Sequence, residues 1–562
     1  MESVDVLLVS YFEDVDRFHN DLVSGPWTER ASGFGGVTGG RVQDARRERQ
    51  AVRIDGERYD LARFMSWAVW GHTREYRRYD AQTGTHLCGT YLESVLRRRG
   101  FTLRHVNHAT RFDLAALAER IEPRYLFLST TFLPEPQNIG EVTKLMQRLW
   151  PGVPVILGGQ ILIEYSKTVP PAVFTHYLQG WGADAVVLSA RAEAQSLAIV
   201  SSEPDQLPKL QLPVTWLRQA DGSYTCSDAP DRAPTVDETA VHWHLLDPEH
   251  VYHLAGMRTA RSCSFACAFC SHPANNGGFD PVEVATVEAE LRWQRELGVV
   301  KRINFTDDTF NVPLRRFRKI LDLLSRHGFE WGCYFRCQYA DEDTVKAMAD
   351  AGCRSVYLGI ESLDDAVLAN MDKKSRRQHY ESGVRWLRRH GIATHANFVF
   401  GFPGEQPDCG ERTLQWVDDH GIDFYCASPF YCSPATPVWG RRGGFGLTGR
   451  YWGWRHDTMD AHQAMAAEAS VIGAGKHATW VSELVAHSGW TAWFMIANGM
   501  SIAGVKEVIG LYNDLCGRDG SAAAISAMPR LAEVRRLIQA GRFPQPPDAT
   551  LTTAIEPAAS VD

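Results

Sequence analysis

Short hydrophobic runs alternate with amphipathic segments in two separate parts of the chain. The first run, VDVLLVS at residues 4–10, is nearly continuous, which is typical of a strand buried on both faces of a parallel sheet. After a long stretch without this pattern, an amphipathic helix is predicted at residues 89–100, closed by Gly100. Strands are then predicted at 103–106, 124–131, 153–159 and 175–180, and helices at 113–121 and 139–150.

This order predicts a doubly wound, Rossmann-like α/β domain over residues 1–190, with an insertion at about 11–85. The ligand of such a domain lies beyond the carboxyl ends of its strands. Residues 191–255 are rich in Pro and Asp and are predicted to be a linker.

The alternation returns after the linker. Helices are predicted at 282–297, 314–328, 341–352, 382–391 and 411–421, and strands at 301–308, 330–339, 355–362, 394–405 and 423–430. About six strands are fewer than the eight of a full barrel, so we predict a partial (β/α)6 barrel over residues 256–440. Residues 441–542 are predicted to form a helical domain that closes over the substrate, and residues 543–562 a disordered tail.

Composition narrows the functional classes. The chain has 562 residues, of which 44% are hydrophobic and 22% charged, as expected for a globular protein of several domains. The net charge of −8 and the lack of a long basic run argue against a nucleic-acid partner. The acidic start and the lack of an apolar run near roughly 18 residues predict a cytoplasmic protein without a membrane partner. The 12 cysteines, mostly isolated, are predicted to be reduced.

One short stretch departs from this background. RSCSFACAFCSH, residues 261–272, brings Cys263, Cys267 and Cys270 close together. Three thiolates fill three corners of a four-iron cubane and leave the fourth iron open to a ligand. With His272 as a fourth ligand the same residues would hold zinc, although structural zinc sites usually pair two separated knuckles. The alternative from another class is therefore a zinc-stabilised binding protein.

The trio and the segments after it resemble the radical S-adenosylmethionine (SAM) superfamily. The signature C-x3-C-x-aromatic-C is matched with Phe269 as the aromatic residue. NFTDDTF at 304–310, YLGIESLDDAVLANMDKK at 357–374 and NFVFGFPGE at 397–405 resemble strand motifs of the cobalamin-dependent branch. The resemblance covers about residues 255–440.

This resemblance implies a [4Fe-4S] cluster on the three cysteines and SAM on the open iron. Residues at strand ends would hold the ribose and the amine of SAM. The candidates for SAM binding are Phe269, Arg336, Glu361, Ser362 and Asn397.

The first domain resembles the cobalamin-binding domain of that branch. Small polar and glycine positions at its strand ends would let the backbone approach the nucleotide tail. These positions are Ser129, Thr130, Gly158, Gly159 and Gln160.

The residue below the cobalt is a separate question. GTHLCG offers His86 as a cobalt ligand, although Gly84 replaces the aspartate that orients such a histidine in related domains. A noncoordinating side chain from the insertion is the alternative, with Trp70, Arg74 and Arg77 as candidates.

Two cofactors of this kind imply a cobalamin-dependent radical SAM methyltransferase. The methyl group of SAM would pass through methylcobalamin to an unactivated carbon, or phosphorus, of a specialised-metabolite precursor, which is a small molecule or a peptide. A flavodoxin- or ferredoxin-type electron donor is implied. The chain is loosely similar to the thiopeptide tryptophan 2-C-methyltransferases and the phosphinate P-methyltransferases. A rearrangement or cyclisation without methylation is the enzymatic alternative.

Candidate substrate contacts lie at the ends of barrel strands and in the helical domain. Tyr425, Tyr431 and Asp308 are the candidate catalytic residues, and Asp307 is a weaker one. Aromatic residues at helical spacing are more often core than pocket. Those of the predicted lid are Trp452, Trp454, His456, Trp480, Trp490 and Trp493.

Overall fold

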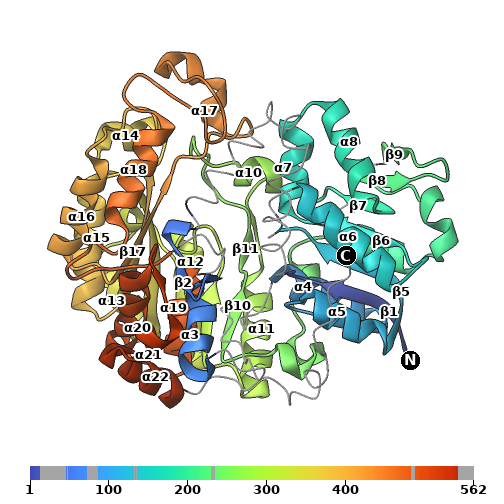
Figure 1. The fold of residues 1–562 in the computed structure, drawn as a ribbon, viewed down its shortest axis with the longest axis horizontal. Helices are drawn as coiled ribbons and strands as arrows, with labels where there is room; N and C mark the ends of the chain where they lie inside the picture. Colours follow the sequence, from blue (N-terminus) through green and yellow to red (C-terminus); the bar gives the residue numbers. More distant parts are fainter. Residues whose placement is uncertain are drawn as a thin grey trace.

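The computed structural model describes residues 1–12, 46, 48–71, 87–131, 133, 136–229, 234–482 and 488–541. Two α/β bodies lie side by side in this part of the chain (Figure 1). In the described residues no helix is both long enough and apolar enough to span a bilayer.

The first body is built on a sheet with the order β4-β1-β5-β6-β7-β8-β9. The first five strands in this order are parallel, and they follow the 2-1-3-4-5 order of a flavodoxin-like doubly wound sheet. Their bounds are β1 (Glu2–Val9), β4 (Leu103–Val106), β5 (Ile121–Ser129), β6 (Val155–Gly158) and β7 (Ala185–Val187).

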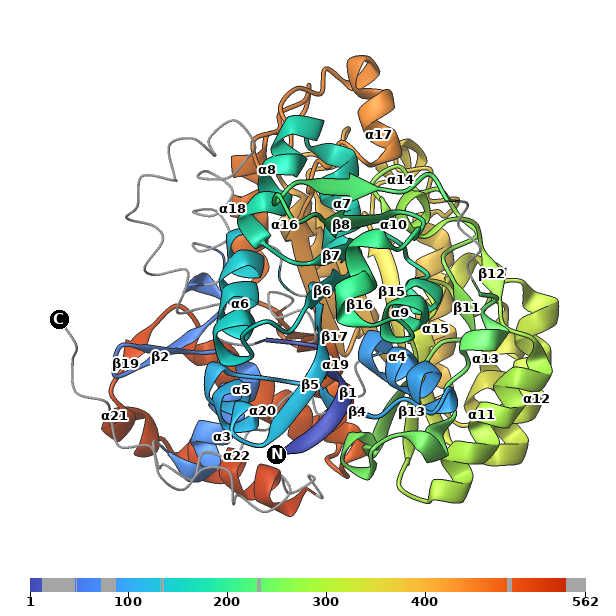
Figure 2. The same ribbon diagram turned by 90° about the vertical axis from the view of Figure 1, so that its right-hand side faces the viewer.

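Helices cover both faces of this sheet, as the prediction of a doubly wound domain requires (Figure 2). On one face Leu7 and Leu126 pack with the apolar residues of four helices, and on the other Val6 and Tyr125 pack with those of two. The first group is α5 (Arg111–Ala118), α6 (Pro136–Leu149), α7 (Gln160–Thr168) and α8 (Pro171–Trp181), and the second is α4 (Leu87–Arg98) and α9 (Glu193–Val200).

One prediction about this domain is wrong, and one strand of its sheet was not predicted. Residues 175–180 lie inside α8 and do not form a strand. A proline in the first turn and Gly182 in the left-handed conformation, with φ 65°, begin and end that helix. The fifth parallel strand is β7, which is only three residues long and left no periodic signal.

The predicted linker at 191–255 also contains part of the sheet. β8 (Thr215–Arg218) pairs antiparallel with β7, and β9 (Tyr224–Cys226) pairs antiparallel with β8. The stretch that crosses to the second body is therefore shorter than predicted and begins after β9.

The second body is an open sheet with the order β10-β13-β14-β15-β16-β17-β18, and every neighbouring pair is parallel. Within the described residues no ladder joins β10 to β18, so the sheet does not close into a barrel. The strands are β10 (Leu254–Met257), β13 (Arg302–Phe305), β14 (Glu330–Tyr334), β15 (Cys353–Glu361), β16 (Ala393–Phe400), β17 (Phe424–Pro429) and β18 (Thr479–Trp480).

Long amphipathic helices connect these strands and cover the outer face of the sheet. Ile303 and Phe305 of β13, for example, belong to the same core as Phe317 and Ile320 of α12. The helices are α11 (Val284–Leu297), α12 (Leu314–His327), α13 (Glu342–Asp350), α15 (Arg377–Arg389) and α16 (Cys409–His420).

The described part of the predicted insertion packs on the C-terminal helices. Figure 1 shows the blue helix α3 (Leu61–Trp70) among the red helices at the far end of the chain. Arg46 forms a buried ion pair with Glu468, with 2.6 Å between Nη2 and Oε1. The partners in this second body are α18 (Ala461–Val471), α19 (Ser488–Ala497), α20 (Ile502–Leu515) and α22 (Pro529–Ala540).

Glu93 of α4 joins the two bodies. Its Oε2 accepts hydrogen bonds from His105 Nδ1 at 2.8 Å and from His250 Nδ1 at 3.2 Å. Its Oε1 accepts from Arg97 Nε at 2.9 Å and from the backbone N–H of Asp247 at 3.1 Å. Burial opposes ionisation, but the bonds from the two histidines hold the pKa of Glu93 below its usual range.

We predict that Glu93→Ala costs about 3–5 kcal/mol of the free energy of unfolding, because Arg97 and both histidines lose their buried acceptor. Urea unfolding followed by circular dichroism measures the change. The control is Glu381→Ala, because Glu381 pairs with Arg377 at a partly exposed position on α15, where an ion pair contributes less than about 1 kcal/mol. Equal urea midpoints for the two variants would contradict this account.

Candidate active site

The three cysteines lie on a loop between the two sheets. The Ala268 N–H donates to the Met371 carbonyl at 2.7 Å, and the Ala268 carbonyl accepts from the Val438 N–H at 2.9 Å, so the loop is fixed at both sides. Burial raises the pKa of the Cys270 thiol to about 11, and the nearby Cys267 and Cys263 contribute to the rise. The structure therefore brings the predicted trio together.

Arg336 supplies positive charge at this loop. Its Nη2 donates to Cys267 Sγ at 3.2 Å, its Nη1 donates to the Lys373 carbonyl at 3.0 Å, and its guanidinium carbon lies 3.8 Å from the ring centroid of Phe265. Arg336 was predicted to bind SAM, and the structure places it against a cysteine sulfur. Thr309 is a further contact that the sequence did not indicate, with Oγ1 3.5 Å from Cys263 Sγ.

Glu361 ends β15 in the left-handed region, with φ 67°. Its Oε1 accepts from Lys373 Nζ at 2.7 Å, and both side chains are nearly buried. A Cβ at Gly359 would lie 2.5 Å from Glu361 Oε1, so a larger residue there would displace the Glu361 carboxylate. The ion pair with Lys373, which the sequence did not predict, fixes the predicted SAM-binding carboxylate at the strand end.

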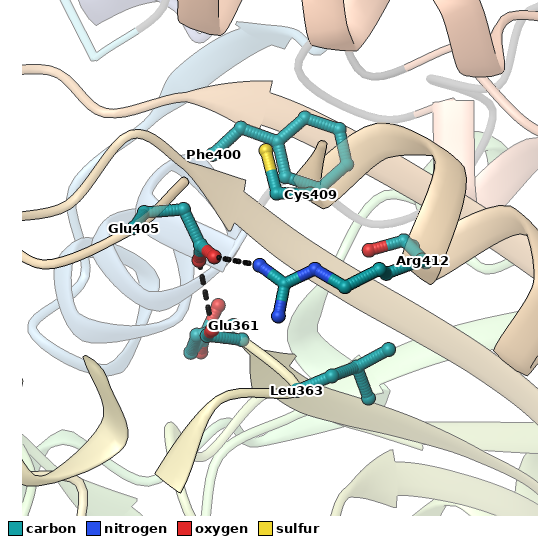
Figure 3. Close-up of a pocket in the computed structure, with 8 residues that line it drawn as sticks. Glu361, Leu363, Phe400, Glu405, Cys409 and Arg412 are labelled. Carbon is teal, nitrogen blue, oxygen red and sulfur yellow. Dashed lines mark hydrogen bonds and ion pairs between the residues drawn. The ribbon is translucent and has the colours of Figure 1, made fainter. Parts of the chain in front are cut away.

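Ser362 is used within the protein. Its hydroxyl donates to Glu405 Oε2 at 2.8 Å, and Arg412 Nη2 donates to Glu405 Oε1 at 3.0 Å. Figure 3 shows the Glu405 carboxylate directed at Arg412, beside the strand end that carries Glu361. A small pocket here is lined by Glu361, Ser362, Leu363, Phe400, Glu405, Cys409, Arg412 and Thr413.

Two further predicted SAM-binding residues lie near the same edge. Asn397 pairs with Gly359 across the sheet, and its Oδ1 accepts from Cys426 Sγ at 2.9 Å. The ring of Phe269 lies 5.5 Å from Lys373 Nζ and packs edge-on against Phe402.

The two aspartates after β13 differ in role. Asp307 is buried and accepts from the Thr259 N–H at 2.9 Å and from Thr259 Oγ1 at 3.0 Å, and burial raises its pKa to about 6. Asp308 Oδ2 lies 3.1 Å from His272 Nδ1. His272 thus faces Asp308 through Nδ1.

The two predicted tyrosines are placed differently. Tyr425 is fully buried, and its hydroxyl donates to the Val471 carbonyl at 2.6 Å and accepts from the Gly475 N–H at 3.0 Å. This placement contradicts its predicted contact with substrate, because the hydroxyl is buried and bonded to the last residue of α18. Tyr431 is 44% exposed, 5.0 Å from the ring of Trp452, and remains a candidate.

Most aromatic residues of the predicted lid belong to the core. Trp454 Nε1 donates to the Phe430 carbonyl at 2.7 Å, and its ring stacks 5.1 Å from His456. Trp480 and Trp493 are also buried. The side chain of Trp490 lies outside the described residues.

The carboxyl edge of the first sheet carries the polar and glycine positions that were predicted. Ser129 Oγ lies 3.1 Å from Cys88 Sγ, a contact that the sequence did not predict. Gly159 has φ 141°, and a Cβ there would lie 2.7 Å from Thr130 Oγ1. The side-chain nitrogen of Gln160 is buried without a hydrogen-bond partner, and a Cβ at Gly158 would meet open space. His86, Arg74, Arg77 and the side chain of Trp70 lie outside the described residues.

The carboxyl edge of the first sheet faces the cysteine loop. Asn275 Nδ2 donates to Glu164 Oε2 at 2.7 Å, and Lys167 Nζ donates to the Ala274 carbonyl at 2.7 Å. These bonds join α7 (Gln160–Thr168) to α10 (His272–Asn276), which lie next to each other between the two bodies (Figure 1). Arg261, just before the trio, donates to Glu193 Oε1 at 3.0 Å. No local pattern in the sequence indicates these contacts.

Residues 257–417 match the model of the radical SAM superfamily. Over these residues the chain is similar to the radical SAM superfamily. The predicted resemblance is confirmed, and the domain implies a [4Fe-4S] cluster and SAM.

Curated relatives match about a third of the chain. An uncharacterised methyltransferase of Pyrococcus horikoshii is 30% identical over 215 residues, which are 36% of this chain and 46% of that protein. The bacteriochlorophyllide d C-12(1)-methyltransferase of Chlorobaculum tepidum is 30% identical over 182 residues, 32% of this chain and 40% of that protein. The chain spans less than half the length of these relatives.

Among solved structures, the fold resembles that of the radical SAM methyltransferase TsrM from Kitasatospora setae, determined with cobalamin and a [4Fe-4S] cluster bound. The TM-score is 0.54 at 15% identity, over 81% of this chain and 97% of that chain. At this identity the likeness establishes a shared fold.

We predict that Cys267→Ser loses most of the iron and sulfide of the anaerobically reconstituted protein, because a serine oxygen is a poor substitute for thiolate at iron. Iron and sulfide per chain, with the visible absorbance, measure the loss. Cys226→Ser is the control, because Cys226 is exposed and lies on β9, away from the trio. A Cys267→Ser protein with an unchanged iron content would show that this residue is not a ligand.

Proposed function

We propose that the protein is a cobalamin-dependent radical SAM methyltransferase that moves the methyl group of SAM, with cobalamin as carrier, to an unactivated carbon or phosphorus of a specialised-metabolite precursor. The observation that carries the proposal is the facing of two edges: the three-cysteine loop lies against the carboxyl edge of a flavodoxin-like sheet, joined to it through Glu164 and Glu193. A ligand of either edge would therefore lie close to the other.

The residues at the loop fit a cluster with one open iron. Three thiols converge there, Arg336 donates to one of the sulfurs, and His272 is paired with Asp308. The carboxylate of Glu361, neutralised by Lys373, stands at the strand end where the amine and ribose of SAM would be held. Arg336 would also favour electron transfer to the cluster, because its positive charge stabilises the reduced form.

The residues at the facing edge fit a corrinoid with its nucleotide tail. Gly158 leaves open space beside the backbone, and the unpaired amide of Gln160 needs a polar partner. Ser129 and Thr130 complete a small polar rim at the end of β5. When bound, SAM supplies a methyl group, and a radical after reductive cleavage, while cobalamin supplies the methyl carrier.

The chain itself contributes positioning and exclusion of water. The two bodies are joined by buried polar contacts, which favour a fixed distance between the two cofactor edges. Tyr431, exposed after β17, and Asp308, which faces His272, are the remaining predicted residues that would contact substrate. A flavodoxin- or ferredoxin-type protein would supply the electrons.

We predict that the cluster-loaded full-length protein, given SAM with a deuterated methyl group, a reductant and hydroxocobalamin, forms S-adenosylhomocysteine and incorporates the label into cobalamin. Mass spectrometry of the extracted cofactor detects the label. With candidate substrates added, the same label appears in the product. A protein that binds cobalamin but cleaves SAM without any transfer of label would support the rearrangement alternative instead.

We further predict that Gly159→Val removes cobalamin binding and leaves the iron content unchanged. The added side chain would meet Thr130 Oγ1 and the Thr131 N–H, both within 3.0 Å of the new Cβ. Cobalamin retained after gel filtration is measured by absorbance.

Gly152→Val is the matched control for Gly159→Val. Gly152 also has positive φ, 82°, but a Cβ there meets nothing within 4 Å. The assignment of the corrinoid to this edge fails if both variants retain cobalamin as the unchanged protein does.

A further inference from the structure

The inner face of the second sheet carries a buried arginine that forms no ion pair within the described residues. Arg302 begins β13, only 1% of its surface is exposed, and Glu330, its register partner on β14, attracts it from beyond ion-pair distance. Its Nη2 donates to Ser355 Oγ, its Nη1 has no partner, and its guanidinium carbon lies 5.3 Å from the ring centroid of Trp493. A buried cation is costly unless an anion and hydrogen bonds compensate it.

Other unpaired groups lie around it. The side-chain nitrogen of Asn304 and Nε1 of Trp493 are buried donors without partners, and both ring nitrogens of His395 are buried and unpaired. Buried polar groups are almost always hydrogen-bonded, so a concentration of exceptions indicates a ligand or ordered water. Below, Arg302, Asn304, His395 and Trp493 are called the inner polar set.

Strand register shows that the inner polar set is contiguous. Asn304 pairs with Gly332, and Gly332 pairs with Ser355, the residue that Arg302 contacts. Tyr357 pairs with His395, with 5.3 Å between the rings, and Trp493 of α19 lies 5.6 Å from Tyr357. These side chains line the face opposite to α12, because the alternate residues Ile303 and Phe305 pack with that helix.

The same face continues to the cofactor edge. Ser355, Tyr357 and Gly359 alternate along β15, and Gly359 pairs with Asn397. One to two side-chain layers along a strand correspond to roughly 7–13 Å. A molecule that reaches from the cofactor edge to Arg302 would therefore be extended, with its reacting atom at one end and an acidic group at the other.

We propose that the inner polar set binds an oxyanion, either carboxylate or phosphinate, and that this anion is the acidic group of the substrate. The guanidinium of Arg302 pairs with two of its oxygens, and the amide of Asn304 and the indole N–H of Trp493 donate to it. His395 contacts the middle of the substrate. The identification of the anion as substrate rests on the proposed function, whereas the anion site itself does not.

Benzoate and benzamide are the first probes, because they share a shape and differ in charge. We expect benzoate to raise the Tm of the cluster-loaded protein increasingly with concentration at constant ionic strength, and benzamide to have no effect. Phenylphosphinate tests the other oxyanion. The proposal would be overturned if benzoate and benzamide raised the Tm equally. It would also be overturned if neither benzoate nor phenylphosphinate raised the Tm.

Arg302→Met removes the charge and keeps the length of the side chain. We expect its Kd for benzoate to rise between about 10- and 100-fold, and the Tm of the ligand-free protein not to fall, because an uncompensated buried charge has been removed. Arg389→Met is the control, since Arg389 ends α15, is exposed and pairs with Glu342 at 2.6 Å. A lower ligand-free Tm with unchanged benzoate affinity would make Arg302 a purely structural residue and overturn the proposal.

Arg302→Lys is the second variant, and it replaces Arg302→Met if that variant does not fold. It retains the charge without the planar fork, so we expect weaker benzoate binding than in the unchanged protein, and unchanged binding would overturn the proposal. Transfer of labelled methyl from SAM to cobalamin, measured in the unchanged protein with a reductant and without substrate, separates this proposal from the proposed function. If the unchanged protein shows no such transfer while benzoate still raises its Tm, the proposed function fails and the anion site stands.

Discussion

Three cysteine sulfurs that converge on one short loop are the feature on which the rest of the site depends, because cysteine sulfurs are the protein ligands of an iron–sulfur cluster. The loop that carries them is fixed by backbone bonds through Ala268, and the guanidinium of Arg336 lies against Cys267. A metal cluster is the partner that the radical SAM domain implies. Because only three cysteines are present on the loop, one iron would remain free to bind a ligand.

The fold gives this cluster site a second cofactor edge. In a parallel doubly wound sheet the ligand lies beyond the carboxyl ends of the strands, and here that edge is turned toward the cysteine loop. Glu93 contributes on the other side, because one buried carboxylate holds side chains of the first sheet and of the segment that enters the second. The separation between the two edges is therefore set by buried polar contacts, which are costly to break.

The sequence predicted much of this, and the failures have physical reasons. Long strands and amphipathic helices such as α12 were predicted because their periodicity is strong. The three-residue strand β7 carries too few positions for a pattern, and the helix before it was mistaken for a strand. Tyr425 was placed at the correct strand, but its direction depends on α18, which packs from a distant part of the chain. Lys373 could not be predicted because its ion pair with Glu361 forms only in the folded chain. Arg302 could not be predicted because its burial with an unpaired Nη1 is likewise visible only in the fold.

The open iron is the central claim, and Mössbauer spectroscopy of the anaerobic, iron-57-reconstituted protein tests it most directly. The account predicts a [4Fe-4S] signal in which one iron of the four changes its isomer shift when SAM is added. A protein that holds zinc in place of iron, or a cluster whose four irons are all unaffected by SAM, would contradict it.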